Sequence, residues 1–374
     1  MDENKWPYES VFYDIFEINP KAQMYVYLAK EGKFELLEKM KNQDEFRKLF
    51  DLLEVKEVKN KEQSILQYLV ENGASYRVLD FANSLFAQTL GSRLDKLNVQ
   101  GAKDEFENTQ PDHFNFRLYN SFEPFIQFLQ KGTPIHLNSK VIRIGHGEKL
   151  VKVDYLNKEG QIKELRASKV VLTVPLGILK SRDIQFDPVL PLQHERAINK
   201  LGFDGGGKVI LWFKEAFWPT DFSICICSDS LFAQFWKERK YTGQTVECLM
   251  GFMMGNRSTE LARLPENKLI SMALKFYDSV FGNSENNYSP ASSNFVDASI
   301  YFWEKNENIK GSYSYQHSSD SSQLRNISNL PINQQLYFSG EAFSLDACAS
   351  VEGSLKSAQL TSQLILDQKK HSKL

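Results

Sequence analysis

The first third of the chain carries apolar residues at spacings of three and four, which predicts amphipathic helices. Helices are expected over residues 34–54, 62–73, 76–91 and around 122–129. Asn72-Gly73 is a typical stop signal at the end of the second helix. The polar stretch 100–113 (QGAKDEFENTQPDH) is expected to form a loop.

From residue 133 onward, short apolar stretches separated by Gly, Asn and Lys predict strands. Strands are expected at residues 135–138, 140–147, 150–156, 162–168, 169–175, 208–214, 223–228, 245–254 and 336–340. The stretch KVVLTVP (169–175) is almost continuously apolar, which is typical of a strand buried on both faces.

Helical patterns return in the second half of the chain, at residues 192–201, 266–282 and 351–370. The last of these places Val351, Leu355, Ala358 and Ile365 on one side. The Ser/Asn-rich stretch 283–294 is expected to be an exposed loop. Helix-rich and strand-rich segments interleave, so the sequence predicts an α/β or mixed α+β protein of two intertwined domains.

The composition is that of an ordinary globular protein, with 374 residues, 42% hydrophobic and 25% charged. The net charge of −2 gives no electrostatic reason to expect nucleic acid or a membrane as partner. No secretory signal pattern follows Met1 and no apolar run reaches the ~18 residues of a membrane span. We therefore expect a soluble intracellular protein, in the cytoplasm.

The cysteines and histidines do not predict a metal site. The four cysteines lack the C-x-x-C spacing of zinc and redox sites, so buried free thiols are expected. The six histidines are scattered without ligand spacing, and His317 and the others are interpreted as surface residues.

Residues 202–208, GFDGGGK, are close to the P-loop signature G-x-x-x-x-G-K-[ST]. A P-loop follows a strand and precedes a helix, but here a helical pattern precedes the glycines and a strand pattern follows. Val209 also replaces the Ser or Thr that would bind Mg²⁺. The pattern favours a Gly-rich turn with a solvated lysine over a nucleotide site.

The segment around this turn resembles the flavin-containing amine oxidase family, which includes polyamine oxidases, monoamine oxidases and lysine-specific histone demethylases. Residues 169–219 contain VVLTVPLGILK, IQFDPVLP and AINKLGF, followed by Lys208 and a strand, in the family's order. Trp303, GSYSY (311–315), LYFSGEA (336–342) and VEGSLKSA (351–358) continue the order, and HLNSKVIRI (136–144) fits upstream. The resemblance covers about residues 60–370.

The resemblance implies an FAD-binding, Rossmann-like half interleaved with a substrate domain of mixed sheet and helices. We expect residues 1–132 to be the helical part of the substrate domain and 133–182 to return to the FAD-binding domain. Residues 183–300 would form the substrate-domain sheet and helices, and 301–374 the C-terminal FAD-binding segment.

One family motif is absent from the sequence. The family begins with a strand and G-x-G-x-x-G, which binds the FAD pyrophosphate. Here Gly145 and Gly147 match the first two glycines without the third, between two predicted strands. The expected FAD-binding half is therefore incomplete. The sequence is interpreted either as a truncated form or as a paralogue that has lost tight FAD binding.

The resemblance assigns roles to individual residues. Lys208 matches the lysine that holds a water at flavin N5, with a surface lysine as the alternative. Glu341 matches the glutamate that binds the ribityl–phosphate region, with a solvated acid as the alternative. Ser350 and Val351 match residues whose backbone meets FAD at the start of the last helix, where N–H groups favour electron-rich groups.

Three further residues match the family's cofactor and substrate positions. Val141 matches a valine whose main chain meets the adenine, and it is equally suited to a core strand. Trp303 and Tyr313 match aromatic residues near flavin and substrate, which attract a cationic amine, or they are core aromatics. Ser312 stands where monoamine oxidases attach FAD to cysteine, so any FAD is expected to be non-covalent.

The resemblance implies FAD-dependent oxidation of an amine to an imine, with O₂ as acceptor and H₂O₂ as product. A small polyamine-like amine is the favoured substrate, because no long helical insertion of the histone demethylase type is visible. The alternative is a non-catalytic paralogue that acts as a binding or scaffold protein without tightly bound FAD.

Overall fold

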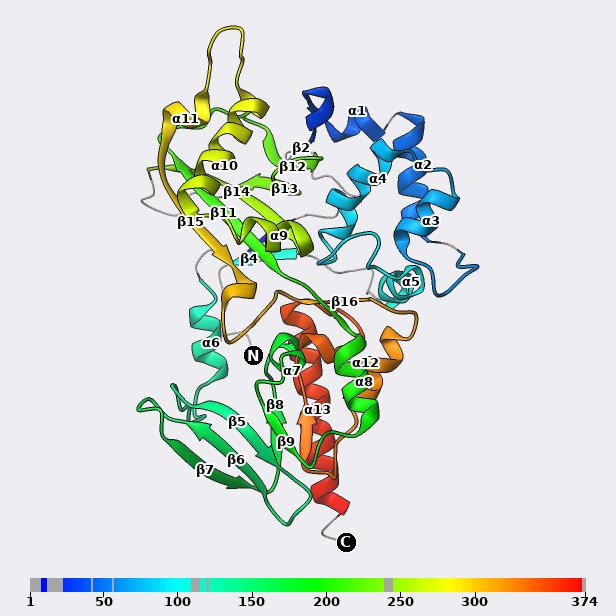
Figure 1. Cartoon of the computed structure of the whole chain (residues 1–374), viewed down its shortest axis with the longest axis vertical. Coiled ribbons are helices and arrows are strands. Elements are labelled where there is room, and N and C mark those ends of the chain that lie inside the picture. The colour runs from blue at the N-terminus through cyan, green and yellow to red at the C-terminus, as the bar shows by residue number, and fades with distance from the viewer. Residues whose placement is uncertain are drawn as a thin grey trace.

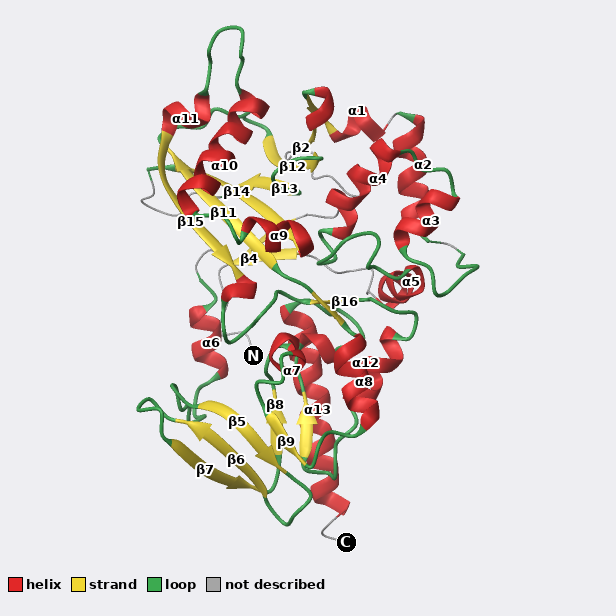
Figure 2. Cartoon of the chain, in the orientation of Figure 1, coloured by secondary structure: helices red, strands yellow, loops and turns green. Residues whose placement is uncertain are grey.

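A computed structural model describes residues 8–11, 23–41, 43–55, 57–108, 115–118, 121–238 and 245–371. Figure 1 shows two lobes, one above the other, which the chain enters more than once. The upper lobe combines a large sheet with helices from the N-terminal third of the chain. The lower lobe combines smaller sheets with the C-terminal helix, so the fold is of the mixed α/β class (Figure 2).

The upper lobe is built on a seven-stranded sheet in the order β15-β11-β14-β13-β12-β2-β3. The strands are β15 (Phe295–Phe302), β11 (Gly206–Phe213), β14 (Glu247–Met254), β13 (Gln234–Lys237), β12 (Phe222–Ser228), β2 (Gln23–Leu28) and β3 (Lys33–Leu36). Burial alternates along β11, where Val209, Leu211 and Phe213 pack in one core with α10 (Glu266–Phe281). Because strand side chains alternate between faces, Lys208 lies on the opposite face.

Short helices cover the other face over β2 and β12, where Val26 and Ile226 belong to their core. These are α1 (Leu37–Lys41), α2 (Asp44–Leu53), α3 (Ile65–Glu71), α4 (Tyr76–Ala82), a π-helix (Asn83–Ala87) and α5 (Val99–Asn108). Ser64 begins α3 with a capping box shared with Gln67, and Ser75 caps α4.

The lower lobe contains a four-stranded sheet in the order β7-β6-β5-β9 and a parallel pair, β17-β8. The strands are β5 (Lys140–Gly145), β6 (Val151–Leu156), β7 (Ile162–Ala167), β9 (Gln185–Asp187), β8 (Val170–Leu172) and β17 (Leu336–Phe338). The helices α7 (Leu176–Lys180), α8 (Leu192–Lys200), α12 (Ser321–Ser328) and α13 (Val351–His371) complete the lobe.

The remaining elements connect or extend the two lobes. Helix α6 (Glu123–Leu129) runs between them, and β10 (Gly202–Phe203) pairs with β16 (Ser314–Tyr315) where the chain passes from one lobe to the other (Figure 1). The upper lobe also carries α9 (Gly255–Leu261) and α11 (Pro290–Asn294), and β1 (Tyr8–Val11) pairs with β4 (Asn115–Leu118). Short 3-10 helices follow β15 (Trp303–Lys305) and β17 (Glu341–Phe343).

Most predicted elements are confirmed, but four predictions of element type are wrong. Residues 290–294, expected as part of the exposed loop 283–294, form α11, with Pro290 and Ala291 buried. Residues 100–108, expected as loop, are helical because the Asn98 side chain caps α5 by accepting the Gly101 N–H at 2.9 Å. Residues 135–138, expected as a strand, pair with no strand among the described residues. Residues 34–36 form β3 against β2 instead of starting a helix. The rest of the expected loop 100–113 lies outside the described residues.

The expected burial is wrong in β8, and the apolar stripe of α13 is not its buried side. Val171 in β8 is 42% exposed, so this strand, which the described residues pair with β17, is not covered on both faces. In α13, Val351 and Leu355 are exposed, and the buried side of the helix carries Gly353, Ser357 and Thr361. These small residues allow close approach to β17, where the Ser357 and Ser339 hydroxyl oxygens lie 3.3 Å apart.

All four cysteines are buried free thiols, as predicted, and the Cys225 and Cys227 sulfur atoms lie 3.9 Å apart. The interpretation of the histidines is confirmed for His317, which is exposed, and wrong for His146 and His194. Both rings are packed inside the protein, and each satisfies a ring nitrogen there with a backbone carbonyl: His146 with that of Pro188 and His194 with that of Leu330. Among the helices described, none combines the length and apolar character that crossing a membrane requires.

Candidate active site

Lys208 lies on β11, beside Phe252 of β14 and Tyr301 of β15. Its ammonium nitrogen is 5.5 Å from the centre of the Trp236 ring, a distance at which the ring face attracts a cation. Because the opposite face of β11 faces the core with α10, the charge of Lys208 is directed away from that core. The lysine is half-buried.

The glycines before Lys208 form the start of a strand, so the P-loop interpretation is excluded by the order of elements. A Cβ atom on Gly207 would lie 2.5 Å from the Phe302 ring, and one on Gly206 would lie 2.6 Å from the Met254 sulfur. Both positions therefore need glycine for close packing against the neighbouring strands.

Asp204, in the same turn, ties β11 to the helical segment. Its carboxylate accepts hydrogen bonds from Ser92 Oγ at 2.6 Å, Lys96 Nζ at 3.0 Å and Tyr315 Oη at 3.1 Å. Its carbonyl oxygen accepts from the backbone N–H of Ser312 at 2.9 Å. The turn, the helical segment and the strand β16 region are thus held in one arrangement around the start of β11.

Trp303 lies at the end of β15, close to the glycine end of β11. Its ring centre is 4.2 Å from that of Tyr301, and 38% of Trp303 and 41% of Tyr301 remain exposed. The next residue, Glu304, accepts hydrogen bonds from the Gly206 N–H at 3.2 Å and from Ser258 Oγ at 2.8 Å. The pair of rings therefore forms a partly exposed aromatic surface in a fixed position beside the start of β11.

Tyr313 is a half-buried phenol held against the turn after the π-helix. Its hydroxyl donates to the Thr89 carbonyl at 2.9 Å, and its ring lies 2.6 Å from where a Cβ on Gly91 would be. Burial raises the pKa of the Tyr313 hydroxyl, and the negative charges of Glu341 and Glu105 raise it further. Tyr313 therefore remains a neutral hydrogen-bond donor at physiological pH.

Glu341 connects β16 with the loop that leads into α13. Its carboxylate accepts hydrogen bonds from the Ser314 hydroxyl at 2.7 Å and from the Ala349 N–H at 2.8 Å. Arg325, which is fully buried, donates to the same Ser314 hydroxyl at 3.1 Å and to the Ala342 carbonyl. The solvated acid that was the alternative for Glu341 does not fit these contacts.

The loop before α13 is held in an unusual backbone conformation. Ala347 and Ala349 have φ angles of 54° and 59°, which residues other than glycine adopt at an energetic cost. A Cβ on Gly353 would lie 2.1 Å from the Ala347 carbonyl oxygen. The Ser350 hydroxyl accepts the Gly353 N–H at 3.0 Å and so caps the helix, and Val351 begins it with 51% of its surface exposed.

Val141 lies apart from this group, in β5 of the lower lobe. It is partly buried against the core of that lobe. The neighbouring Lys140 lies 3.5 Å from Glu307, four residues after Trp303. Contacts thus link Lys208, Trp303, Tyr313, Glu341 and the start of α13, whereas Val141 is connected to them only through the ion pair of its neighbour Lys140 among the described contacts.

Several residues of this region were not identified from the sequence, among them Gln88, Thr89, Gln234 and Trp236. Gln234 donates to Thr89 Oγ1 at 2.8 Å and to the Ser84 carbonyl at 3.0 Å, which fixes the π-helix on the sheet. Gln88 accepts the Met254 N–H at 2.7 Å. A polar residue inside the apolar stretch LFAQFW (231–236) was the one available signal. Single-turn π-helices are frequent at functional sites.

The sequence matches the family described as flavin containing amine oxidoreductase over residues 7–366. The chain belongs to this family. Polyamine oxidase 3 of Oryza sativa subsp. japonica is 26% identical over 298 residues, covering 79% of this chain and 58% of that protein. Polyamine oxidase 2 of Arabidopsis thaliana is 27% identical over 248 residues, covering 66% of this chain and 48% of that protein.

The chain is also similar to proteins named as histone demethylases. Histone demethylase-like protein A of Aspergillus fumigatus is 29% identical over 217 residues, covering 53% of this chain and 19% of that protein. The chain thus spans little more than half the length, or less, of these curated relatives.

Solved structures of amine oxidases share the fold. Cyclohexylamine oxidase from Brevibacterium oxydans IH-35A has a TM-score of 0.75 at 16% identity, covering 93% of this chain and 81% of that one. Wild-type putrescine oxidase bound to putrescine has a TM-score of 0.72 at 14% identity, covering 92% and 81%. The predicted resemblance to the family is confirmed.

The residues around Glu341 fit a polar cofactor that the family implies. Arg325 Nε and Nη2 and Gln316 Oε1 are buried without a hydrogen-bond partner among the described residues, so a further polar group would satisfy them. The capped start of α13 adds N–H groups and the positive end of a helix dipole. No G-x-G-x-x-G occurs in the 374 residues, so the fit concerns the flavin and ribityl side of FAD.

Proposed function

We propose that this chain oxidises an amine with non-covalently bound FAD, and that the amine is a polyamine or a similar small amine. The observation that carries the proposal is the set of contacts linking Lys208, Trp303, Tyr313, Glu341 and the start of α13. When bound, FAD would supply the redox chemistry for oxidising the amine to an imine with O₂ as acceptor and H₂O₂ as product, and the residues described above would hold it.

The proposed role of Lys208 is to hold a water molecule beside the flavin. Its half-buried position on the sheet face opposite the α10 core supports that role. The Trp236 ring below the ammonium group limits the directions in which the side chain can point. Lys208 can then position the water for proton movement without itself bonding to the substrate.

The proposed role of the Tyr301–Trp303 ring pair is to receive the amine. A cationic amine is attracted to an exposed ring face, and the methylene groups of a polyamine pack against the rest of the rings. Tyr313 adds a neutral hydroxyl, which is held by the Thr89 carbonyl. Polyamine oxidases and putrescine oxidase among the similar proteins support a small aliphatic amine as substrate.

The proposed cofactor contacts are Glu341, Ser350, Val351 and, at the adenine side, the main chain of Val141. Glu341 already fixes the Ala349 N–H, and through it the loop that begins α13. Trp303 would complete the cofactor surface at the glycine end of β11.

Purified chain incubated with FAD and passed over a desalting column tests the cofactor directly. We expect flavin to co-elute and H₂O₂ to form with putrescine, spermidine or spermine. Lys208→Met should retain FAD and lose H₂O₂ production, Glu341→Ala should lose FAD, and Lys214→Met, an exposed lysine after the same strand, should behave as wild type.

Protein that takes up no FAD would overturn the proposal and favour the alternative, a binding protein that keeps the fold without the cofactor. Flavin uptake without H₂O₂ from any of the amines would reject the polyamine substrate while leaving cofactor binding in place.

A further inference from the structure

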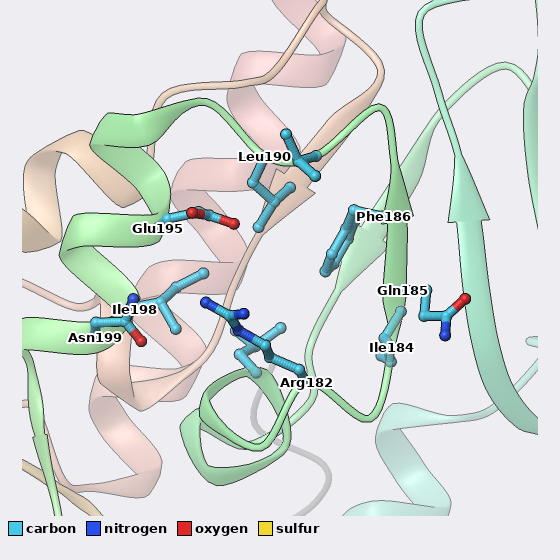
Figure 3. Close-up of a pocket in the computed structure, with 10 residues that line it drawn as sticks. Arg182, Ile184, Gln185, Phe186, Leu190, Glu195, Ile198 and Asn199 are labelled. Atoms are coloured by element: carbon cyan, nitrogen blue, oxygen red, sulfur yellow. The ribbon is translucent and has the colours of Figure 1, made fainter.

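The lower lobe contains a cavity of about 340 Å³ between α7, β9 and α8 (Figure 3). Its floor is apolar and nearly inaccessible, formed by Leu179, Ile184, Leu190 and Ile198 with the Phe186 ring at one side. A mostly apolar cavity of this size with a few polar groups at its edge is the usual form of a small-molecule site. None of the residues assigned above to the amine or the cofactor lines it.

Two oppositely charged side chains are directed into this cavity. Figure 3 shows the Arg182 guanidinium and the Glu195 carboxylate both pointing into the space between α8 and β9, while Gln185 points away. The structure records no ion pair between these two groups. Within the described parts of the chain, neither side chain has a hydrogen-bond or ion-pair partner.

Arg182 has a backbone conformation that is unfavourable for an arginine. Its φ angle is 56°, in the left-handed region where glycine or asparagine would cost less. The turn that ends α7 is closed by the Arg182 N–H on the Leu179 carbonyl at 3.2 Å. This turn places the guanidinium at the cavity edge, across from the first turn of α8 that carries Glu195.

We propose that this cavity binds a free amino acid with a large apolar side chain. Its carboxylate would pair with Arg182, its ammonium group with Glu195, and its side chain would lie on the floor beside Phe186. A ligand carrying an anion alone would meet the charge of Glu195, and one carrying a cation alone would meet that of Arg182. A zwitterion satisfies both charges, and the apolar floor selects its side chain.

The proposal is tested by measuring the binding of L-leucine and of L-phenylalanine to the purified chain with titration calorimetry or NMR. We expect saturable binding of both and none of glycine, which lacks an apolar side chain. The methyl ester and the N-acetyl derivative of each amino acid should bind at least about tenfold more weakly, because each loses one charged hydrogen-bonding group.

Two variants locate the site. Arg182→Asn retains a residue that tolerates the left-handed backbone, and Glu195→Gln retains the shape of the side chain. Each should weaken binding by about tenfold or more, and Glu195→Gln should bind the N-acetyl derivative as wild type does. Lys158→Asn and Glu159→Gln, in the exposed turn after β6, make the same charge changes elsewhere and should have no effect.

The proposal is overturned if neither amino acid binds saturably, or if the ester binds as tightly as the free acid. It is also overturned if binding is unchanged in Arg182→Asn and Glu195→Gln, since the amino acid would then occupy another place, such as the proposed amine site. None of these measurements needs FAD, so the outcome is independent of the proposed oxidase activity.

Discussion

The ammonium nitrogen of Lys208 lies 5.5 Å from the centre of the Trp236 ring, although the two residues come from different strands of the large sheet. Lys208 is paired with Phe252, Phe252 with Gln234, and Trp236 follows two positions later on the same face. The register of three strands therefore brings the lysine over the aromatic ring. The position of the charge depends on that register as much as on β11 itself.

Replacing Lys208 by methionine should affect activity far more than stability. The side chain faces away from the core of β11 and α10, so we expect the free energy of unfolding to change by less than about 1 kcal/mol. If the lysine positions water for proton movement, H₂O₂ production should fall by roughly 100-fold. Urea unfolding and steady-state kinetics at equal flavin content measure the two effects. A loss of stability as large as that of a core substitution would contradict this placement of the lysine.

Glu341→Ala should loosen the start of α13. The carboxylate holds the Ser314 hydroxyl and the Ala349 N–H, and hydrogen bonds to charged groups contribute roughly 1.5–3 kcal/mol each. We expect the free energy of unfolding to fall by about 2 kcal/mol, and by less in Glu341→Gln, which keeps an acceptor. Equal midpoints of urea unfolding for wild type and Glu341→Ala would show that these bonds do not support the loop.

Gly353→Ala should disturb the same loop by a steric route. The added Cβ would meet the Ala347 carbonyl oxygen at 2.1 Å, so the backbone of the loop or the helix must shift. Overpacking of this kind costs roughly 1–3 kcal/mol. Thermal unfolding should reveal the loss, while Gln359→Ala, on the exposed side of the same helix, serves as the matched control. A Gly353→Ala protein as stable as its control would mean that the loop relaxes freely.

Lys180 should make the free energy of unfolding depend on pH in the alkaline range. Burial lowers the pKa of Lys180 to about 8, so between pH 10.5 and about 8 the unfolded chain binds this proton more readily than the folded one. The free energy of unfolding of the wild type should therefore decrease as the pH falls through this window. Below about pH 8, Lys180 should contribute no further change.

Lys180→Met removes the titrating group but also its hydrogen bond to the Asn199 carbonyl. The stability difference between the variant and wild type should shift in favour of the variant by roughly 1 kcal/mol from pH 10.5 to pH 7, since solvent screens a half-buried charge. Urea unfolding across this range measures the shift, with Lys131→Met, an exposed lysine, as control. A difference independent of pH would contradict the lowered pKa.

The sequence predicted most helices and strands because their patterns are local, but the apolar stripe that it identified in α13 is not the buried side of that helix. Val351 and Leu355 are exposed there, and Ser357 and Thr361 are buried. Periodicity finds a stripe, whereas burial depends on which residues let the helix approach its neighbour closely. In α13 these are small residues, which hydrophobicity patterns do not weigh.

The candidate site was predicted in part for a similar reason. Motif order identified Lys208, Glu341 and Trp303, since each follows a recognisable segment. Trp236, Gln234 and Arg325 were missed, because their roles arise from strand register and from the burial of a guanidinium beside Ser314. Such contacts join residues without local sequence signals. The helix α5 was missed for a local reason, because the cap at Asn98 was not recognised before a glycine and a charged run.

The passages of the chain between the lobes also determine how this protein can be taken apart. Because α6, β10 and the segment between β15 and β16 each lead from one lobe to the other, neither lobe is encoded by one uninterrupted stretch. A single protease cut or a single gene breakpoint therefore cannot release either lobe as an independent unit. A recombination that exchanges one lobe for a relative's must therefore replace more than one segment of the chain.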